Sequence, residues 1–122
     1  MMLWIGVAAL AVAVAAVVVW KVRTRPVAKL TLRDGSGPGL EFPLRAGRVT
    51  IGSEEGRTVV VSHPKVSGLH ATLLLEDGRF LLHDRSKRGT RVNGRAVEEA
   101  DLHSGDLIRL ADSIDLIFTR LR

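Results

Sequence analysis

The sequence predicts an all-β fold, a sandwich of short strands, preceded by a single membrane-spanning α-helix. Three observations support this prediction. Residues 3–20 contain no charged or polar side chain. After residue 27, short alternating segments recur between Gly, Pro and Asp-Gly turn signals that stand roughly eight to twelve residues apart. No ten-residue stretch there has helical periodicity. The alternation of apolar and polar residues predicts that each strand buries one face, as two packed sheets require.

Residues 1–20 are predicted to form the transmembrane helix. At about 1.5 Å per residue, the apolar run reaches roughly 27 Å, close to the hydrocarbon thickness of about 30 Å. Trp4 and Trp20 bracket the run, where indole rings favour the two membrane interfaces. Two alternatives stay open. One is a buried helix of a soluble core, and the other is a cleavable signal peptide with small-residue cleavage patterns in AVAVAA.

The basic residues predict the orientation of the chain in the membrane. All 18 Lys and Arg residues follow the apolar run, and Lys21, Arg23 and Arg25 lie in a basic juxtamembrane linker, residues 21–27. The positive-inside rule therefore places the C-terminal domain in the cytoplasm. Basic residues near the surface also favour anionic lipid, by about 1 kcal/mol each. The chain has only three Phe and two Trp, so a nucleic-acid surface is not expected despite the net charge of +5.

The domain itself is assigned to residues 28–122. Its strand candidates are the segments 28–32, 40–44, 48–52, 58–62, 70–76, 79–84, 90–97, 106–110 and 113–121. Two of the connections are strong hairpin signals, Asp77-Gly78 and Asn93-Gly94, because both residues of such a turn adopt positive φ. These signals predict antiparallel pairing of the flanking strands.

The last strand candidate has the clearest alternation in the chain. Ile114, Leu116 and Phe118 fall on one face, and Asp115 and Thr119 fall on the other. Because successive side chains of a strand point to opposite faces, the first three are predicted to face the core.

The residues that catalysis would need are missing or scattered. With no cysteine, the chain has no disulfide, thiolate metal site or cysteine nucleophile. The four histidines, His63, His70, His83 and His103, lack metal-ligand spacing. The acidic pairs Glu54-Glu55 and Glu98-Glu99 are interpreted as solvated loop charge. The sequence therefore predicts a binding module, with no enzymatic activity, cofactor or metal site.

Several short motifs stand in a specific order along residues 28–120. They are Ile51-Gly52, Ser67-Gly68-Leu69-His70, Asp84, Ser86, Gly89-Thr90, Asn93-Gly94 and a late segment with Leu102, Gly105, Asp106, Ile108 and Leu110. In this order and spacing they resemble the forkhead-associated (FHA) domain family. The resemblance implies a β-sandwich of about eleven strands that binds phosphothreonine peptides through loops at one end.

The candidate binding residues depart from the pattern of that family. Ser53 stands where the family has the Arg of a Gly-Arg pair, and Gly68 follows Ser67. Arg88 replaces the family's Asn, with Lys87 before it. Of the phosphate contacts that the resemblance implies, only Ser67 keeps its identity. Lys87 and Arg88 are either anion-binding charges in a new geometry or a solvated pair on a turn.

The structural positions of the family pattern, by contrast, are all present. They are Gly52, His70, Gly89, Thr90, Asn93 and Gly94. The resemblance implies that His70 braces the loops and does not touch the ligand. The scaffold is thus expected to be kept while the chemistry of the ligand site is changed.

These observations lead to a functional prediction. The chain is interpreted as a membrane-anchored FHA-like module that docks a protein partner or helps to assemble a membrane complex. Phosphate-independent docking is preferred, because the expected Arg and Asn are missing. The alternative is a phosphothreonine-binding adaptor in Ser/Thr kinase signalling, which recognises a Thr-phosphorylated or acidic segment. A lipid-surface or nucleic-acid binder is the remaining class.

Overall fold

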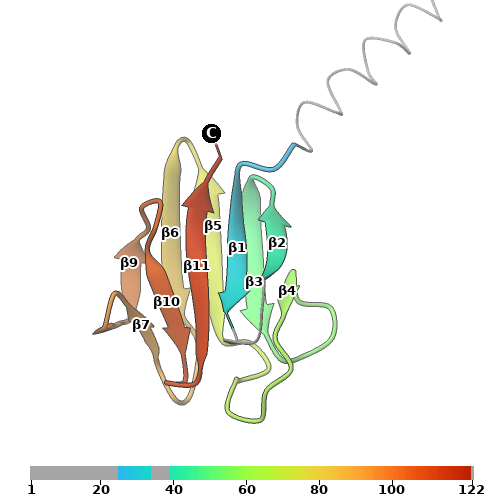
Figure 1. Cartoon of the computed structure of the whole chain (residues 1–122), viewed down its shortest axis with the longest axis vertical. Helices are drawn as coiled ribbons and strands as arrows, with labels where there is room; N and C mark the ends of the chain where they lie inside the picture. Colours follow the sequence, from blue (N-terminus) through green and yellow to red (C-terminus); the bar gives the residue numbers. More distant parts are fainter. Residues whose placement is uncertain (1–24, 34–38, 122) are drawn as a thin grey trace, which may run out of the picture.

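The computed structural model describes residues 25–33 and 39–121. Within these ranges the chain forms eleven β-strands and no helix, arranged as two packed sheets (Figure 1). The predicted all-β sandwich of about eleven strands is therefore confirmed. The predicted membrane-spanning segment, residues 1–20, lies outside the described residues. In the part of the chain that is described, no helix is long and apolar enough to cross a membrane.

The two sheets contain six and five strands. The first has the order β2 (Leu40–Leu44), β1 (Ala28–Arg33), β11 (Ile114–Arg120), β10 (Leu107–Leu110), β7 (Thr90–Val92) and β8 (Arg95–Val97). The second has the order β4 (Val59–Val60), β3 (Gly47–Gly52), β5 (Ala71–Glu76), β6 (Arg79–Asp84) and β9 (Glu99–Asp101). Neighbouring strands run antiparallel, apart from the parallel pair β3 and β4. Four pairs of consecutive strands form hairpins, namely β1 with β2, β5 with β6, β7 with β8, and β10 with β11.

The core lies between the two sheets and is built from alternate residues of each strand. Leu116 and Phe118 are fully buried, and Ile114 is partly buried at its edge, which confirms the predicted inward face of β11. The rings of Phe80 and Phe118 lie 5.1 Å apart, centroid to centroid, and join the two sheets. The guanidinium carbon of Arg120 lies 5.1 Å from the centre of the Phe80 ring and shields its outer side.

The hairpin turns have the backbone geometry that their sequences predict. Asp77 has φ of 51° and Gly78 has φ of 74°, while Asn93 and Gly94 have φ of 51° and 85°. Both turns therefore have positive φ at both central residues, the arrangement that matches the twist of the flanking strands.

Two strands differ from the sequence prediction. Glu99 was predicted to lie in a loop, but it belongs to β9, which pairs with β6. The prediction was wrong because a three-residue edge strand with two exposed acids shows no usable alternation. The segment 58–62 forms only the two-residue strand β4, although Val61 beyond it is buried.

The chain enters and leaves the sandwich at the same end. The Leu121 N–H donates a 2.9 Å hydrogen bond to the carbonyl oxygen of Val27, just before β1. The loops that follow β3, β4 and β6 lie at the opposite, lower end in Figure 1. The motifs around Gly52, Ser67, His70 and Gly89 therefore lie at the end remote from both flanks of the domain, while the late segment with Gly105 lies beside Phe118 toward the other end.

Candidate functional site

Three loops meet at the lower end of the sandwich. They are the β3–β4 loop (residues 53–58), the β4–β5 loop (residues 61–70) and the β6–β7 loop (residues 85–89). The Ser53 N–H donates a 3.0 Å hydrogen bond to the carbonyl oxygen of Ser67, which ties the first loop to the second. The three loops thus form one continuous surface.

The close approach of two loops depends on Gly52. A Cβ atom at this position would lie only 2.0 Å from the carbonyl oxygen of Gly68. No side chain fits in that space without moving the backbone. Gly52 therefore allows the contact between the β3–β4 and β4–β5 loops. This agrees with the structural role that the sequence predicts for Gly52.

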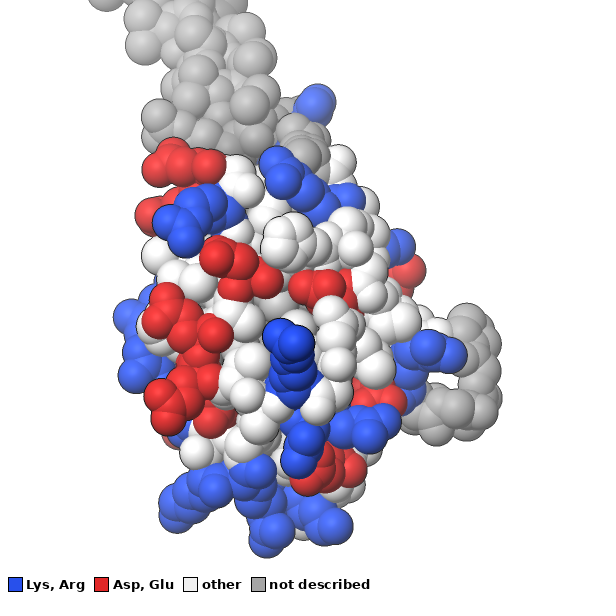
Figure 2. All heavy atoms as spheres, turned by 90° about the vertical axis from the view of Figure 1, so that its left-hand side faces the viewer, with Lys and Arg blue, Asp and Glu red and all other residues white. Residues whose placement is uncertain are grey.

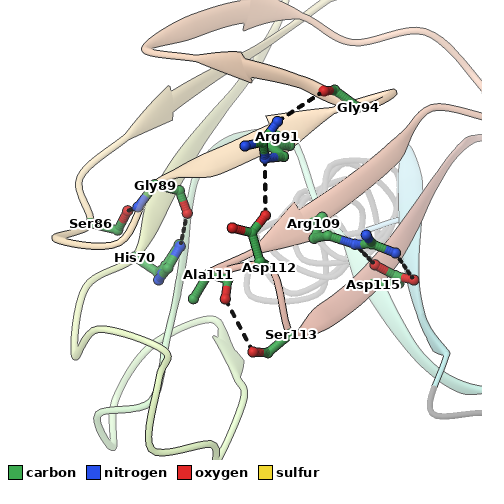
Figure 3. A network of polar contacts seen from close by, with 10 residues as sticks. All are labelled: His70, Ser86, Gly89, Arg91, Gly94, Arg109, Ala111, Asp112, Ser113 and Asp115. Atoms are coloured by element: carbon green, nitrogen blue, oxygen red, sulfur yellow. Dashed lines mark hydrogen bonds and ion pairs between the residues drawn. The ribbon is translucent and has the colours of Figure 1, made fainter.

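His70 joins the second loop to the third. Its buried ring accepts a 3.1 Å hydrogen bond at Nδ1 from the Ser67 N–H, so Nε2 carries the proton. Nε2 then donates to the carbonyl oxygen of Gly89 at 2.9 Å (Figure 3). Burial lowers the pKa of His70 below 6.5, although the Gly89 bond and Asp84 act in the opposite direction. A neutral histidine thus braces two loops.

The β6–β7 loop is held from inside by Asp84. Its Oδ1 accepts hydrogen bonds from the Ser86 N–H (3.0 Å), the Ser86 hydroxyl (2.6 Å) and the Thr90 hydroxyl (2.9 Å). The Gly89 N–H donates to the Ser86 Oγ at 2.7 Å. Burial raises the pKa of Asp84, but the hydrogen bonds from Ser86 and Thr90 outweigh it and bring the pKa below 3.8. Ser86, Gly89 and Thr90 therefore shape the loop.

The Asn93-Gly94 turn fixes the β7–β8 hairpin to β10. The Asn93 amide donates to Asp106 Oδ1 at 3.0 Å and accepts from the Leu107 N–H at 3.0 Å. The Gly94 carbonyl accepts a 3.2 Å hydrogen bond from Arg91 (Figure 3). Arg91 also pairs with Asp112, in the turn of the β10–β11 hairpin. Both polar atoms of the Asn93 side chain are therefore bonded within the domain.

Ser67 lies where all three loops meet. Its N–H is bonded to His70, its carbonyl accepts from Ser53, and its hydroxyl oxygen accepts a 3.2 Å hydrogen bond from the Lys87 N–H. The Ser67 hydroxyl proton is not used in that bond. This half-buried hydroxyl can therefore donate to a ligand placed over the loops.

The other predicted binding residues surround Ser67 unequally. The Ser53 hydroxyl donates to the carbonyl oxygen of Val66 at 3.0 Å, so it already has a partner inside the protein. Lys87 and Arg88 are exposed, and neither forms an ion pair within the described residues. Figure 2 shows Lys and Arg side chains gathered at this lower end. The structure thus brings together Ser53, Ser67 and Lys87. Arg88 is the next residue of the chain after Lys87.

An arginine that the sequence prediction overlooked also lies at this site. Arg57 Nε donates a 3.0 Å hydrogen bond to the carbonyl oxygen of Gly68, the residue after Ser67. Its Nη2 pairs with Glu54 Oε2 at 2.7 Å. The Arg57 side chain is 25% exposed, so the guanidinium is fixed by protein contacts yet open to solvent. The β3–β4 loop thus supplies an arginine, four residues beyond Ser53.

Comparison with known proteins identifies the fold family. The FHA domain family matches residues 49–111, just over half of the chain. The chain belongs to the FHA domain family. The ABC transporter ATP-binding/permease protein Rv1747 of Mycobacterium tuberculosis is 40% identical over 88 residues, 71% of this chain and 10% of that protein. The chain therefore spans about a tenth of the length of that relative.

Solved FHA domains share the architecture. The FhaA FHA domain, solved in complex with the intracellular domain of Rv3910, is 34% identical with a TM-score of 0.69 over 75% of this chain and 98% of that one. An FHA domain from a study of phosphothreonine-dependent interactions is 32% identical, with a TM-score of 0.72 over 78% and 97%. Rv1747 FHA-1 of Mycobacterium tuberculosis is 27% identical, with a TM-score of 0.68 over 81% and 100%.

Within this FHA domain, the position of Arg57 changes the interpretation of the loop surface. The sequence prediction counted the family's arginine as lost at Ser53. The signal that pointed to its replacement was the glycine-arginine pair later in the same loop, Gly56-Arg57. The loops that meet at Ser67 thus carry three cationic residues, Arg57, Lys87 and Arg88. Such a surface is suited to holding an anion.

Proposed function

We propose that this FHA domain binds a phosphothreonine-containing segment of a partner protein at its loop end. Family membership supports the general function, a protein-interaction module. The similar FhaA domain was solved in complex with a partner domain, and another similar FHA domain comes from a study of phosphothreonine-dependent interactions. No described residues form a group that suits a metal ion.

The observation that carries the proposal is the guanidinium of Arg57 beside Gly68. A bound phosphate needs a cation that is already fixed in place, because ordering a long side chain costs conformational entropy. The 3.0 Å hydrogen bond to Gly68 fixes Arg57 before any ligand arrives. The guanidinium has five N–H donors, and two are used in the contacts with Gly68 and Glu54. The others can bond to phosphate oxygens.

The remaining groups of the site match the other needs of a phosphate. A phosphorylated threonine carries close to two negative charges and three strong acceptor oxygens. The Ser67 hydroxyl has a proton to donate, since its oxygen already accepts from the Lys87 N–H. The exposed Lys87 and Arg88 side chains add positive charge next to that hydroxyl. Together they would attract and orient the dianion.

Glu54 opposes binding in the free protein. Its carboxylate pairs with Arg57 at 2.7 Å, and a Cβ atom on Gly68 would lie 3.2 Å from Glu54 Oε2. Glu54 therefore covers the place where a ligand would reach the guanidinium. Because the side chain of Glu54 is 63% exposed, it can swing away at little cost. A phosphate dianion outcompetes a single carboxylate for the same cation.

The proposal reverses the order of the two mechanisms that the sequence suggested. Phosphate-independent docking was preferred because the expected Arg and Asn are both missing, and Arg57 removes the first of these two reasons. Arg88 remains unable to reproduce the amide pairing of the family's Asn, since it has donors and no acceptor. We therefore expect the phosphate to provide most of the affinity and the flanking peptide to provide less.

We further propose that the domain acts at the cytoplasmic face of a membrane. The support is the sequence pattern alone, with an apolar run at residues 3–20 and basic residues Lys21, Arg23 and Arg25 after it. In this arrangement the FHA domain would collect phosphorylated partners beside the membrane. Lipid contact would be limited to the apolar run and the basic linker.

Binding to a phosphothreonine peptide library tests the proposed function. The full chain in detergent micelles is incubated with the library and with the same library after phosphatase treatment. Micromolar binding that disappears after dephosphorylation and weakens as salt rises is the expected result. Equal capture of both libraries would support phosphate-independent docking, and capture of neither would refute a peptide-binding function for these loops.

A further inference from the structure

The outer face of the five-stranded sheet has an ordered distribution of charge. Its side chains alternate with the core residues of the same strands. In one row across the sheet, Arg48 on β3 is paired in register with Leu74 on β5, Leu74 with Leu81 on β6, and Leu81 with Asp101 on β9. This row runs from a cation through two leucines to an anion. The centre of the face is thus apolar and its two sides have opposite charge.

The rows on either side of this one carry charge in other arrangements. Toward the upper end the polarity is reversed, because Glu76 on β5 is paired in register with Arg79 on β6. Arg79 also forms a 3.2 Å ion pair with Asp101 in the same chain. Toward the loop end, Thr50 lies on the β3 side of the face and Glu99 lies on the β9 side. Figure 2, which views the edge of the sandwich from the β9 side, shows acidic side chains running along it. The face therefore carries Arg48 at β3, the two acids Asp101 and Glu99 at β9, and between them an acid-base pair of the opposite order, Glu76 and Arg79.

The apolar centre of the face is not flat. Leu74 is 41% exposed, one of the few large apolar side chains of the described domain that solvent reaches. A hollow of about 160 Å³ lies beside it toward Arg79 and Leu81, and another of about 210 Å³ lies toward Arg48 and His83. A protruding leucine between two hollows is suited to meshing with a surface of the same shape.

We propose that a second copy of this chain packs on this face, with a two-fold axis parallel to the strands. That rotation exchanges the β3 and β9 sides of the facing sheet. Arg48 of one copy then faces Asp101 of the other, and Leu74 faces Leu81. Glu76 likewise faces Arg79. A two-fold contact uses the same patch on both copies, so each of these pairs occurs twice.

The alternative two-fold axis, perpendicular to the strands, does not fit. It would place Arg48 against Arg48 and Asp101 against Asp101, and like charges in direct opposition repel. It would also turn the two copies end to end. The parallel axis keeps both Val27 residues at the same end of the pair. The loop ends also point the same way and stay uncovered, so the inference does not depend on phosphopeptide binding. It rests only on the proposed membrane placement.

The size of the face predicts a weak association. The axis sets β3 against β9 and β5 against β6, and β4 has no counterpart. Four strands about 4.8 Å apart and up to six residues long cover roughly 19 by 20 Å, or about 400 Å² for each copy. The total of about 800 Å² is below the range of stable specific interfaces, so the two copies are expected to associate only weakly in solution. Tethering in one membrane raises the local concentration of both copies and would favour the pair. The test therefore uses the full chain in membranes.

Cross-linking through introduced cysteines tests the geometry, since the native chain has no cysteine. Chains with Thr50→Cys and chains with Glu99→Cys are co-expressed and treated with a thiol cross-linker that spans about 10 Å, the separation of packed sheets. The mixture should cross-link, because these two positions face each other across the axis. Thr50→Cys chains alone should not, because their two thiols lie on opposite sides of the face. Equal yields in both cases would overturn the proposal.

Charge reversal tests the complementarity independently. Arg48→Asp alone or Asp101→Arg alone places like charges together, so the cross-link yield should fall about tenfold. A mixture of Arg48→Asp chains with Asp101→Arg chains should recover the yield, because opposite charges face each other again. Recovery also shows that both variants fold. Arg95→Asp, an exposed change on the other sheet, is the matched control. No recovery in the mixture would refute the proposed pairing.

Discussion

Arg57 Nε donates a 3.0 Å hydrogen bond to the carbonyl oxygen of Gly68, eleven residues further along the chain. This bond joins the β3–β4 loop to the loop that carries Ser67. It also gives the guanidinium one orientation, with part of its edge toward solvent. The arginine that the sequence pattern lacks at Ser53 is thus supplied from another position of the same loop.

Arg57→Gln should weaken binding of phosphothreonine peptides. A hydrogen bond to a charged group contributes about 1.5–3 kcal/mol, which corresponds to roughly a tenfold to hundredfold loss of affinity. Fluorescence anisotropy with a labelled peptide selected from the library measures the change. Arg95→Gln removes the same charge from an exposed site on β8 and should have little effect. Equal affinities of wild type and Arg57→Gln would exclude Arg57 from the site.

Glu54→Gln should have the opposite effect and strengthen phosphopeptide binding. The change removes the carboxylate that pairs with Arg57 at 2.7 Å and also removes its repulsion of the phosphate. Exposed ion pairs contribute up to about 1 kcal/mol, so a gain of roughly three- to fivefold is expected. Glu55→Gln, at the next exposed position, should not change the affinity. A weaker complex with Glu54→Gln would mean that Glu54 helps to bind the ligand.

Phe118→Ala should destabilise the domain by about 3–5 kcal/mol. The ring is fully buried and packs on Phe80, so its removal leaves a cavity between the sheets. Such a loss is a large part of the stability of a small domain. A thermal melt followed by circular dichroism measures it, with Leu40→Ala as the control because Leu40 is 60% exposed. Similar melting temperatures for both variants would contradict the inward face of β11.

Acidification below pH 6.5 should destabilise the domain through His70. Burial lowers the pKa of His70 in the folded state, so the unfolded chain binds a proton more readily than the folded one. Stability is therefore retained above pH 6.5 and decreases as the pH falls through that value. Asp84 acts in a second window, because its pKa is lowered and its stabilising contribution is lost as the pH falls below 3.8.

Melting temperatures recorded from pH 7.5 to 5 test the histidine effect. The wild-type value should fall across this range by more than that of His70→Gln, which has no group to protonate at this position. The variant is also expected to melt at a lower temperature at pH 7.5, because the brace between Ser67 and Gly89 is disturbed. Parallel pH profiles of the two proteins would show that the other histidines cause the decrease.

Protease protection tests the predicted topology. Because all basic residues follow the apolar run at residues 3–20, the domain should be cytoplasmic and the run uncleaved. Protease added outside intact cells should leave the domain whole and should digest it after the membrane is permeabilised. Digestion in intact cells, or a mature N-terminus near Ala15, would contradict this topology.

Most of the fold could be predicted because its strands carry their own signals. The inward side chains of β11 alternate strictly, and the Asp77-Gly78 and Asn93-Gly94 turns have sequences that positive φ requires. β9 could not be predicted in this way. Its three residues have two exposed acids, and only pairing with β6 makes them a strand.

The scaffold of the site was easier to predict than its chemistry. At Gly52 only a residue without a side chain fits, and His70 bonds to two loops through its two ring nitrogens. The residue types at these positions therefore indicate their structural roles directly. Arg57 reaches the site through the conformation of the β3–β4 loop and a contact with a backbone carbonyl. A backbone carbonyl is present at every residue, so no sequence pattern marks the one at Gly68 as a partner.

The hydrogen bond between Leu121 and Val27 holds the first and last described segments of the domain side by side. Where a unit's first and last residues are neighbours, it can be inserted into a longer protein without stretching the host chain. The recognition loops lie at the far end and stay accessible whatever is attached. A domain of this kind can therefore be joined to domains of unrelated activity within one protein. This agrees with a match that covers only 10% of a transporter.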